Sequence, residues 1–177
     1  MSTNLSVAPT PSAPALTLRP WRDEDAPGLV AAHRDPLLTR WLAHHLADEA
    51  QALRWIGEQT EGRAAGARFS FAMVEEGCTV GHITVKRAKA AGSAEVGYWT
   101  AGSARGRGIA PRALDVLSRW ALGPECPLPV TRLELLHAVG NEGSCRVALK
   151  CGYALEAVLP PLPPSRPGKG HLHVREG

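Results

Sequence analysis

The stretch from Glu95 to Trp120 reads EVGYWTAGSARGRGIAPRALDVLSRW and decides the fold of the chain. It predicts a strand, a short turn and an amphipathic helix. In the turn, Gly106 and Gly108 remove side chains where another group must approach the backbone, and Arg105 and Arg107 add positive charge. Unpaired N–H groups at a helix start, together with the helix macrodipole, favour anions. The turn therefore predicts an anion site, with a diphosphate as the anion.

Three interpretations of this turn compete. In the first, the glycines serve backbone geometry alone and the arginines are solvated. The second, a dinucleotide-binding fingerprint, fails because residues 106–111 spell G-x-G-x-x-P and the acid about 20 residues on, Glu125, lies in a proline-rich loop. A Walker A loop also fails, because the chain contains no G-K-[ST]. The third interpretation, a family resemblance, depends on the rest of the chain.

The composition is that of a globular protein. The chain has 177 residues, of which 44% are hydrophobic and 21% charged, so one domain with a sizeable core is expected. The net charge of +3 is compatible with an anionic cofactor. No block of Lys and Arg predicts a nucleic-acid surface.

The first fifteen residues, MSTNLSVAPTPSAPA, predict a disordered tail, and residues 16–177 a single domain. The start of the chain lacks the basic and apolar regions of a signal peptide, and no stretch approaches the roughly 18–20 apolar residues of a membrane span. We therefore expect a cytoplasmic protein without a membrane partner, present as a monomer or a homodimer.

The cysteines and histidines do not predict a metal site. No C-x-x-C pattern occurs, and the thiols are expected to be reduced. His171 and His173, like the pair at 44–45, are potential ligands, but two histidines without a third convergent ligand are typical of a surface. The expectation is that the protein uses no metal.

The remaining elements follow from hydrophobic periodicity and turn residues. A first strand at 16–21 precedes two or three helices between residues 23 and 62, and a meander of three strands ends at Thr100. After the helix that follows the glycine turn come an apolar strand at 130–137, a helix capped by Asn141, and strands at 153–159 and 171–175. A strand, a crossover helix and a strand over about 40 residues predict a parallel neighbouring pair.

Three motifs at matching spacings resemble the GCN-related N-acetyltransferases (GNAT). Arg105 to Ala110 fits [QR]-x-x-G-x-[GA], the acetyl-CoA pyrophosphate loop of that superfamily. Leu16 to Pro20 is similar to the opening strand of its ribosomal-protein N-terminal acetyltransferase branch. Asn141 to Tyr153, NEGSCRVALKCGY, resembles that branch's N-x-x-S-x-[RK]-V-[AL]-x-[KR]-x-G-[FY] signature. The resemblance covers about residues 15–176.

The resemblance implies a mixed α/β fold. Its mostly antiparallel central sheet would have about seven strands flanked by helices, with a splayed parallel strand pair at the cofactor site. It also implies acetyl-CoA as cosubstrate and transfer to a primary amine, of a protein N-terminus or a small molecule, by direct attack in a ternary complex. The implied cofactor-binding residues are Tyr98, Trp99, Thr100, Arg105, Gly106, Arg107, Gly108, Ile109, Ala110, Asn141 and Ser144.

Two carboxylates are candidates for the general base. Glu134 lies inside an apolar strand, and its alternative role is an ion pair with Arg132 or with an arginine of a helix. Glu95, at the start of the cofactor strand, is the second candidate. An α-amine, with a pKa of about 7.7–8.0, needs only a modest base, whereas a Lys side chain near 10.4 is almost wholly charged. Ser144 is the acid that the family signature suggests, although its hydroxyl could instead serve the start of the helix.

The chain departs from the family pattern in two places. Ala148 stands where some relatives carry a tyrosine, and the loop from Pro160 to Gly170 holds no acid. The missing acid argues against a ribosomal-protein acceptor. A non-catalytic acyl-CoA-binding sensor of the same fold remains the alternative function.

Overall fold

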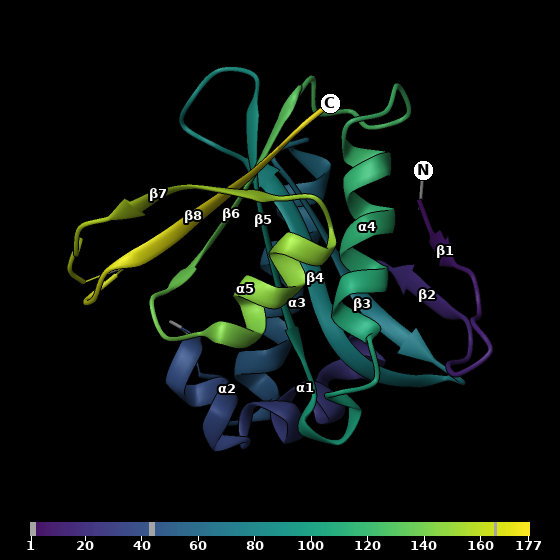
Figure 1. Ribbon diagram of the computed structural model, residues 1–177. Coiled ribbons are helices and arrows are strands. Elements are labelled where there is room, and N and C mark those ends of the chain that lie inside the picture. Colours follow the sequence, from purple (N-terminus) through teal and green to yellow (C-terminus); the bar gives the residue numbers. More distant parts are fainter. Residues whose placement is uncertain (1–2, 43–44, 165) are drawn as a thin grey trace.

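A computed structural model describes residues 3–42, 45–164 and 166–177. Eight strands of this described part form one sheet in the order β1-β2-β3-β4-β5-β6-β8-β7 (Figure 1). The strands are β1 (Leu5–Val7), β2 (Leu16–Arg19), β3 (Arg68–Glu75), β4 (Cys78–Arg87), β5 (Ser93–Thr100), β6 (Arg132–Ala138), β7 (Ala154–Leu159) and β8 (Gly170–Glu176). The helices are α1 (Ala26–His33), α2 (Pro36–Trp41), α3 (Glu49–Ala64), α4 (Ile109–Ala121) and α5 (Glu142–Lys150), with short 3-10 helices at Asp23–Asp25 and Gly102–Ala104.

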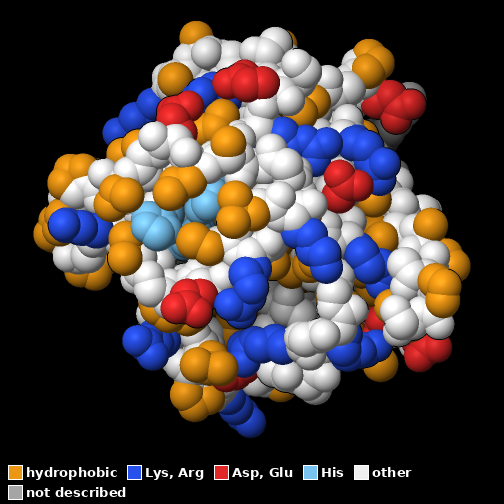
Figure 2. Space-filling view, viewed as in Figure 1, with side chains coloured by type: hydrophobic (Ala, Val, Ile, Leu, Met, Phe, Trp, Pro, Cys, Tyr) orange, Lys and Arg blue, Asp and Glu red, His pale blue; other side chains and the backbone are white. Residues whose placement is uncertain are grey.

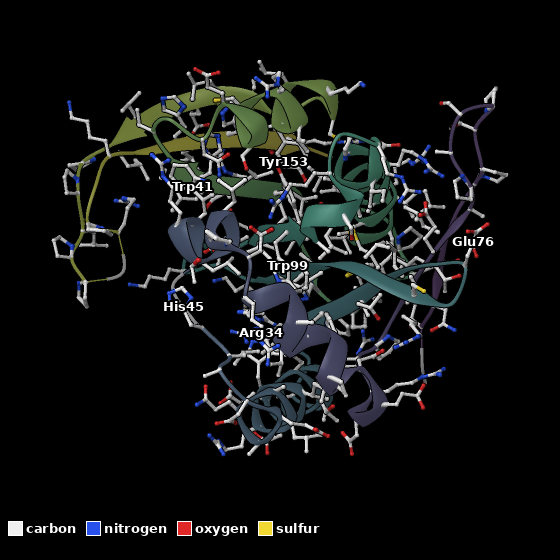
Figure 3. The ribbon with its side chains drawn as sticks, turned by 90° about the horizontal axis from the view of Figure 1, so that it is seen from below. Arg34, Trp41, His45, Glu76, Trp99 and Tyr153 are labelled. Carbon is white, nitrogen blue, oxygen red and sulfur yellow. The ribbon has the colours of Figure 1, made fainter. Side chains whose placement is uncertain are left out.

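Helices cover both faces of the sheet. The larger core cluster joins α4 and α5 to one face, and the smaller cluster joins α1 to α3 to the other. Tyr153 belongs to the first cluster and Trp99 to the second, and Figure 3 shows them on opposite sides of the sheet. Among the helices that the structure describes, none is long and apolar enough to cross a membrane.

Helix α4 confirms the periodicity on which its prediction depended. The predicted amphipathic helix buries residues at helical spacing, which form one apolar stripe: Ile109, Ala113, Leu114, Leu117 and Ala121. The helix runs between β5 and β6, and these two strands are parallel, whereas every other pair in the sheet is antiparallel. The predicted mixed α/β fold with one parallel pair is therefore confirmed.

The parallel pair is short. Pairing between β5 and β6 begins at Ser93↔Arg132 and ends at Val96↔Leu135. Beyond that point β5 stays paired with β4 as far as Thr100, while β6 stays paired with β8 as far as Ala138. The two strands therefore follow different partners and separate, which is the predicted splay.

The prediction of a disordered tail was wrong for Leu5–Val7. This segment forms edge strand β1, antiparallel to β2, and the Val7 side chain is buried in the main core. The guanidinium of Arg112 donates hydrogen bonds to the carbonyls of Ala8 and Pro14, both at 2.7 Å. Composition alone missed this strand because three alternating residues gain stability only from the sheet edge beside them. The same strand raises the predicted seven strands to eight.

His82 is a buried polar group in the smaller core cluster. Its Nδ1 accepts a hydrogen bond of 3.0 Å from Trp21 Nε1, and the rings of Trp55 and Trp99 lie against it. Burial, with smaller contributions from the charges of Arg68 and His33, lowers the pKa of His82 to about 3. The imidazole is therefore neutral in the folded protein.

We expect acid to destabilise the fold through His82. In the folded protein His82 takes up a proton only near pH 3, whereas in the unfolded chain it does so near pH 6.5. The stabilisation that neutral His82 gives the fold is therefore complete above about pH 6.5 and declines as the pH falls below that value. Between about pH 7.5 and about pH 5.5 the loss in unfolding free energy is about 1.4 kcal/mol. Urea denaturation at both pH values should show this loss, and His82→Gln should show a smaller one. An equal pH dependence in both proteins would contradict the assignment.

Candidate active site

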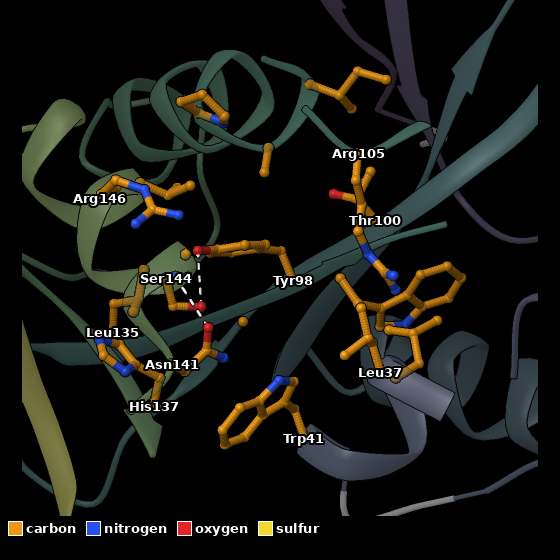
Figure 4. Close-up of a pocket in the computed structure, with 18 of the residues that line it drawn as sticks. Leu37, Trp41, Tyr98, Thr100, Arg105, Leu135, His137, Asn141, Ser144 and Arg146 are labelled. Carbon is orange, nitrogen blue, oxygen red and sulfur yellow. Dashed lines mark hydrogen bonds between the residues drawn. The ribbon is translucent and has the colours of Figure 1, made fainter. Parts of the chain in front are cut away.

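An open cavity of about 1010 Å³ lies where β5 and β6 separate (Figure 4). Its walls come from α2, the far ends of β5 and β6, the glycine turn with the start of α4, and α5. Past Val96, the edge of β5 that faced β6 has lost its strand partner. Backbone groups along Gly97–Thr100 are thus available to a ligand with amide groups, because an extended strand edge offers alternating donors and acceptors.

The glycine turn forms one end of the cavity. Gly106 and Gly108 have φ angles of +74° and +73°, in the left-handed region that a residue with a Cβ adopts only with strain. Gly108 is the N-cap of α4, and no side chain caps this helix. The first-turn N–H groups of α4 therefore have no partner within the helix, as expected for an anion site.

The two arginines of the turn are engaged by carboxylates. Arg105 lines the cavity, and its Nη2 lies 2.6 Å from Oδ2 of Asp35, the residue that caps α2. Hydrogen bonding from the backbone N–H of Leu37, and then from Arg105, lowers the pKa of Asp35. Arg107 instead points away from the cavity lining and pairs with Glu75. The backbone, more than these side chains, is left to attract an anion.

The other end of the cavity is built by the start of α5. Asn141 caps this helix, as predicted, because its Oδ1 accepts a hydrogen bond of 3.2 Å from Ser144 N. The hydroxyl of Tyr98 donates to Ser144 Oγ at 3.2 Å, so β5 and α5 meet across the splay (Figure 4). Burial raises the pKa of Tyr98 to about 12. The phenol therefore stays protonated near neutral pH and acts as a donor.

The structure does not bring the predicted bases to the cavity. Glu134 Oε1 lies 3.1 Å from Arg132 Nε, and the same guanidinium also holds Glu156 and Glu176. Glu95 pairs with Lys86 at 2.9 Å. The two glutamates are register partners within the paired part of β5 and β6, before the strands separate. Among the residues that the structure describes, no Asp or Glu lines the cavity.

Sequence reasoning missed the contribution of α2. Three apolar side chains of α2 line the cavity, namely Leu37, Leu38 and Trp41, and so does Leu42, which directly follows the helix. Trp41 is 37% exposed and Leu37 is 52% exposed, so α2 presents an apolar surface to the cavity. The clustering of apolar residues in a short helix was the available signal, but nothing in the sequence placed that helix opposite β6.

His137 and the basic residues of α5 were also missed. His137 lies in the cavity wall on β6, and Arg146 and Lys150 line it from α5. Figure 2 shows Lys and Arg side chains gathered around this side of the molecule. Arg146 Nη1 lies 3.7 Å from Glu142 Oε2, and both of these side chains are largely exposed, so Arg146 and Lys150 still add positive charge at this side of the cavity.

A family model described as an acetyltransferase (GNAT) domain matches residues 15–154. The chain belongs to the GNAT family. A search of curated proteins finds no significant match.

Solved structures share the fold of this GNAT chain at low sequence identity. The microcin C7 self-immunity acetyltransferase MccE, solved with acetyl-CoA and AMP, is 19% identical, with a TM-score of 0.81 over 97% of this chain and 99% of that one. RimL, a ribosomal L7/L12 α-N-protein acetyltransferase solved with coenzyme A, is 16% identical, with a TM-score of 0.82 over 97% of each chain. A putative ribosomal-protein-serine acetyltransferase from Vibrio cholerae is 22% identical, with a TM-score of 0.81 over the whole of both chains. At these identities the likeness concerns the fold.

Proposed function

We propose that this GNAT chain is an acetyl-CoA-dependent N-acetyltransferase that acts on a primary amine in a ternary complex. The observation that carries the proposal is the splay between β5 and β6. The opening between these strands runs from the glycine turn, at the uncapped start of α4, to the hydrogen-bonded pair of Tyr98 and Ser144. An extended molecule with an anionic end, an amide-containing arm and a reactive end fits such a path. Complexes of fold neighbours with acetyl-CoA or coenzyme A support this assignment.

Acetyl-CoA would lie along that path with its diphosphate at the glycine turn. The N–H groups of Arg105, Gly106, Arg107, Gly108, Ile109 and Ala110 are the proposed diphosphate donors. Those of Ile109 and Ala110 have no partner within α4, whereas the Arg105 N–H lies 3.5 Å from the carbonyl of Gly102 and would exchange this partner for the ligand. The backbone of Tyr98, Trp99 and Thr100 would pair with the pantetheine arm, and Asn141 would contact it near the thioester. Fixing both ends holds a flexible thioester in the geometry for attack.

The acceptor we propose is an amine that is partly neutral without help, such as the α-amine of a protein or peptide. At pH 7 an α-amine is roughly 10% neutral, whereas a Lys side chain is less than about 0.1% neutral. The described cavity lining offers no carboxylate to remove a proton from a Lys side chain. The apolar rim of Leu37 and Trp41 also disfavours a charged group beside the reacting nitrogen.

The amine nitrogen would attack the thioester carbonyl carbon, and the C–S bond would then break. The departing sulfur takes a proton and leaves as the CoA thiol, while the nitrogen loses one to solvent. Ser144 is the proposed donor to the sulfur, and its hydroxyl proton is replaced from Tyr98, which already donates to Ser144 Oγ. Tyr98 then takes a proton from the solvent that received the one lost by the nitrogen, so the phenol is restored. This route needs no carboxylate, in agreement with the positions of Glu95 and Glu134.

Two other functions would use the same acetyl-CoA site. One is acetyl transfer to a small-molecule amine. The other is a non-catalytic acyl-CoA sensor, which the lack of a carboxylate in the described cavity lining favours. Incubation of the protein with acetyl-CoA and a panel of peptides and small amines separates them by thiol release. Turnover on peptides with a free N-terminus supports the proposal. Stabilisation by acetyl-CoA without turnover on any amine supports the sensor, and absence of both overturns the two together.

Gly108→Ala should weaken the binding of coenzyme A. A Cβ at a φ of +73° strains the turn by about 1 kcal/mol and displaces the N–H groups aimed at the diphosphate. Gly66→Ala is a matched control, because Gly66 has a φ of +63°, equally open surroundings and no place in the cavity lining. We expect similar losses in thermal stability but at least about a tenfold weaker affinity for Gly108→Ala alone, measured by calorimetry. Equal affinities in the two variants would argue against this diphosphate site.

Tyr98→Phe should lower kcat by about 100-fold, within the range typical of a lost proton donor. Glu134→Gln and Glu95→Gln should change kcat/KM by less than about threefold, because both carboxylates are held in sheet ion pairs. Steady-state thiol release with an accepted amine measures all three variants. A large loss in Glu134→Gln with little change in Tyr98→Phe would restore the carboxylate as the base.

A further inference from the structure

Three histidines and a cysteine meet beside the cavity, on β6, β8 and α5. His137 on β6 is the register partner of His171 on β8, and His173 follows two residues later on the same face of β8. Cys145, in the first turn of α5, completes the group. One ligand atom from each of these four side chains lies within 4.8 Å of all the others.

His137 presents a nitrogen that has no protein partner. His137 is only 9% exposed, and its Nδ1 donates a hydrogen bond of 3.0 Å to the carbonyl of Ala138. Its Nε2 is buried and makes no hydrogen bond. A buried polar atom of this kind is costly unless something binds it. With Nδ1 protonated, Nε2 carries the lone pair that a metal ion takes.

His173 is held in the same way. Its Nδ1 lies 3.4 Å from the carbonyl of Tyr153, and its Nε2 faces Cys145 Sγ at 3.6 Å. A histidine that binds a metal usually donates its other N–H to a carbonyl or a carboxylate, which fixes the tautomer.

The spacing around the thiol fits a tetrahedral ion. Cys145 Sγ lies 3.3 Å from His171 Nδ1 and 3.6 Å from His173 Nε2. Zn²⁺ bonds of about 2.0–2.1 Å to nitrogen and about 2.3 Å to sulfur give tetrahedral edges of roughly 3.3–3.7 Å. One thiolate and three imidazoles are ligands that suit zinc, whereas Mg²⁺ and Ca²⁺ require oxygen.

We propose that His137, Cys145, His171 and His173 form a Zn²⁺ site that fastens α5 to β6 and β8. Cys145 releases its thiol proton on binding, and the three imidazoles bind in their neutral form. Four protein ligands close the coordination sphere, as in structural zinc sites. The acetyl transfer proposed above uses no metal, so this zinc has a structural role.

The zinc would have a consequence for the cavity. Cys145 is next to Ser144, and His137 lines the cavity wall. An ion bound to both would fix the first turn of α5 against β6. Cys145 and His171 are partly exposed, so an ion can reach the cluster from solvent, and Figure 2 shows histidine side chains at the surface on this face of the molecule. The expectation from sequence that no third ligand converges does not hold in the described structure.

The test uses the full chain, freed of metal by chelator and dialysis, without acetyl-CoA or acceptor. Its outcome is therefore separate from that of the proposed function. Titration of Zn²⁺ against a chromophoric chelator should give one ion per chain and a dissociation constant below about 1 µM. Zn²⁺ at about 100 times its dissociation constant shifts the folding equilibrium about 100-fold, which raises the thermal midpoint by roughly 5–10 °C. Mg²⁺ and Ca²⁺ should cause no shift.

Variants assign the ligands. Cys145→Ser and His171→Gln should weaken Zn²⁺ binding at least about 100-fold and abolish the thermal shift, since each removes one bond. Cys78→Ser, an exposed thiol outside the cluster, should bind as the wild type does. Co²⁺ should show thiolate charge-transfer absorption in the wild type and in Cys78→Ser, but not in Cys145→Ser. His171→Gln changes a half-exposed residue and is compared only after circular dichroism shows that it is folded. Zn²⁺ binding weaker than about 10 µM, or binding that Cys145→Ser and His171→Gln leave unchanged, overturns the site.

Discussion

The separation of two parallel strands governs the rest of this protein. Up to Val96 and Leu135, β5 and β6 satisfy each other's backbone groups, and beyond them each strand follows its other neighbour. Backbone polar groups that have lost their strand partner bond to water or to a ligand, and in the proposed function the amides of the pantetheine arm take that place. The cavity, the exposed edge of β5 and the position of α5 all follow from that divergence.

Charge is distributed so that the cavity itself holds no described acid. Arg132 holds three carboxylates on the sheet, Lys86 holds Glu95, and the turn arginines pair with Asp35 and Glu75. The donors that remain for an anionic ligand are backbone N–H groups and the basic side chains of α5. Fixed dipoles of this kind do not reorganise when a ligand's charge changes, which suits acyl transfer.

Helix α5 connects the two proposed sites. Its cap and first turn supply Asn141 and Ser144 to the cavity, while Cys145 faces the histidines of β6 and β8. A helix of nine residues is marginally stable alone and depends on its contacts for position. A metal bridge at its first turn would therefore act where the geometry of the cavity is most sensitive to movement.

The sequence by itself determined the elements whose signals are local. Periodicity and turn residues predicted α4, the glycine turn and the Asn141 cap, because each depends on residues close together in the chain. The order strand, crossover helix, strand predicted the parallel pair, and the family resemblance implied its splay. Tertiary structure alone decided what depends on distant partners. It turned part of the expected tail into β1, placed α2 against the cavity, held Glu134 on Arg132 and brought Cys145 to three histidines. These outcomes depend on strand register and on the face each side chain takes, which are fixed only when the sheet assembles.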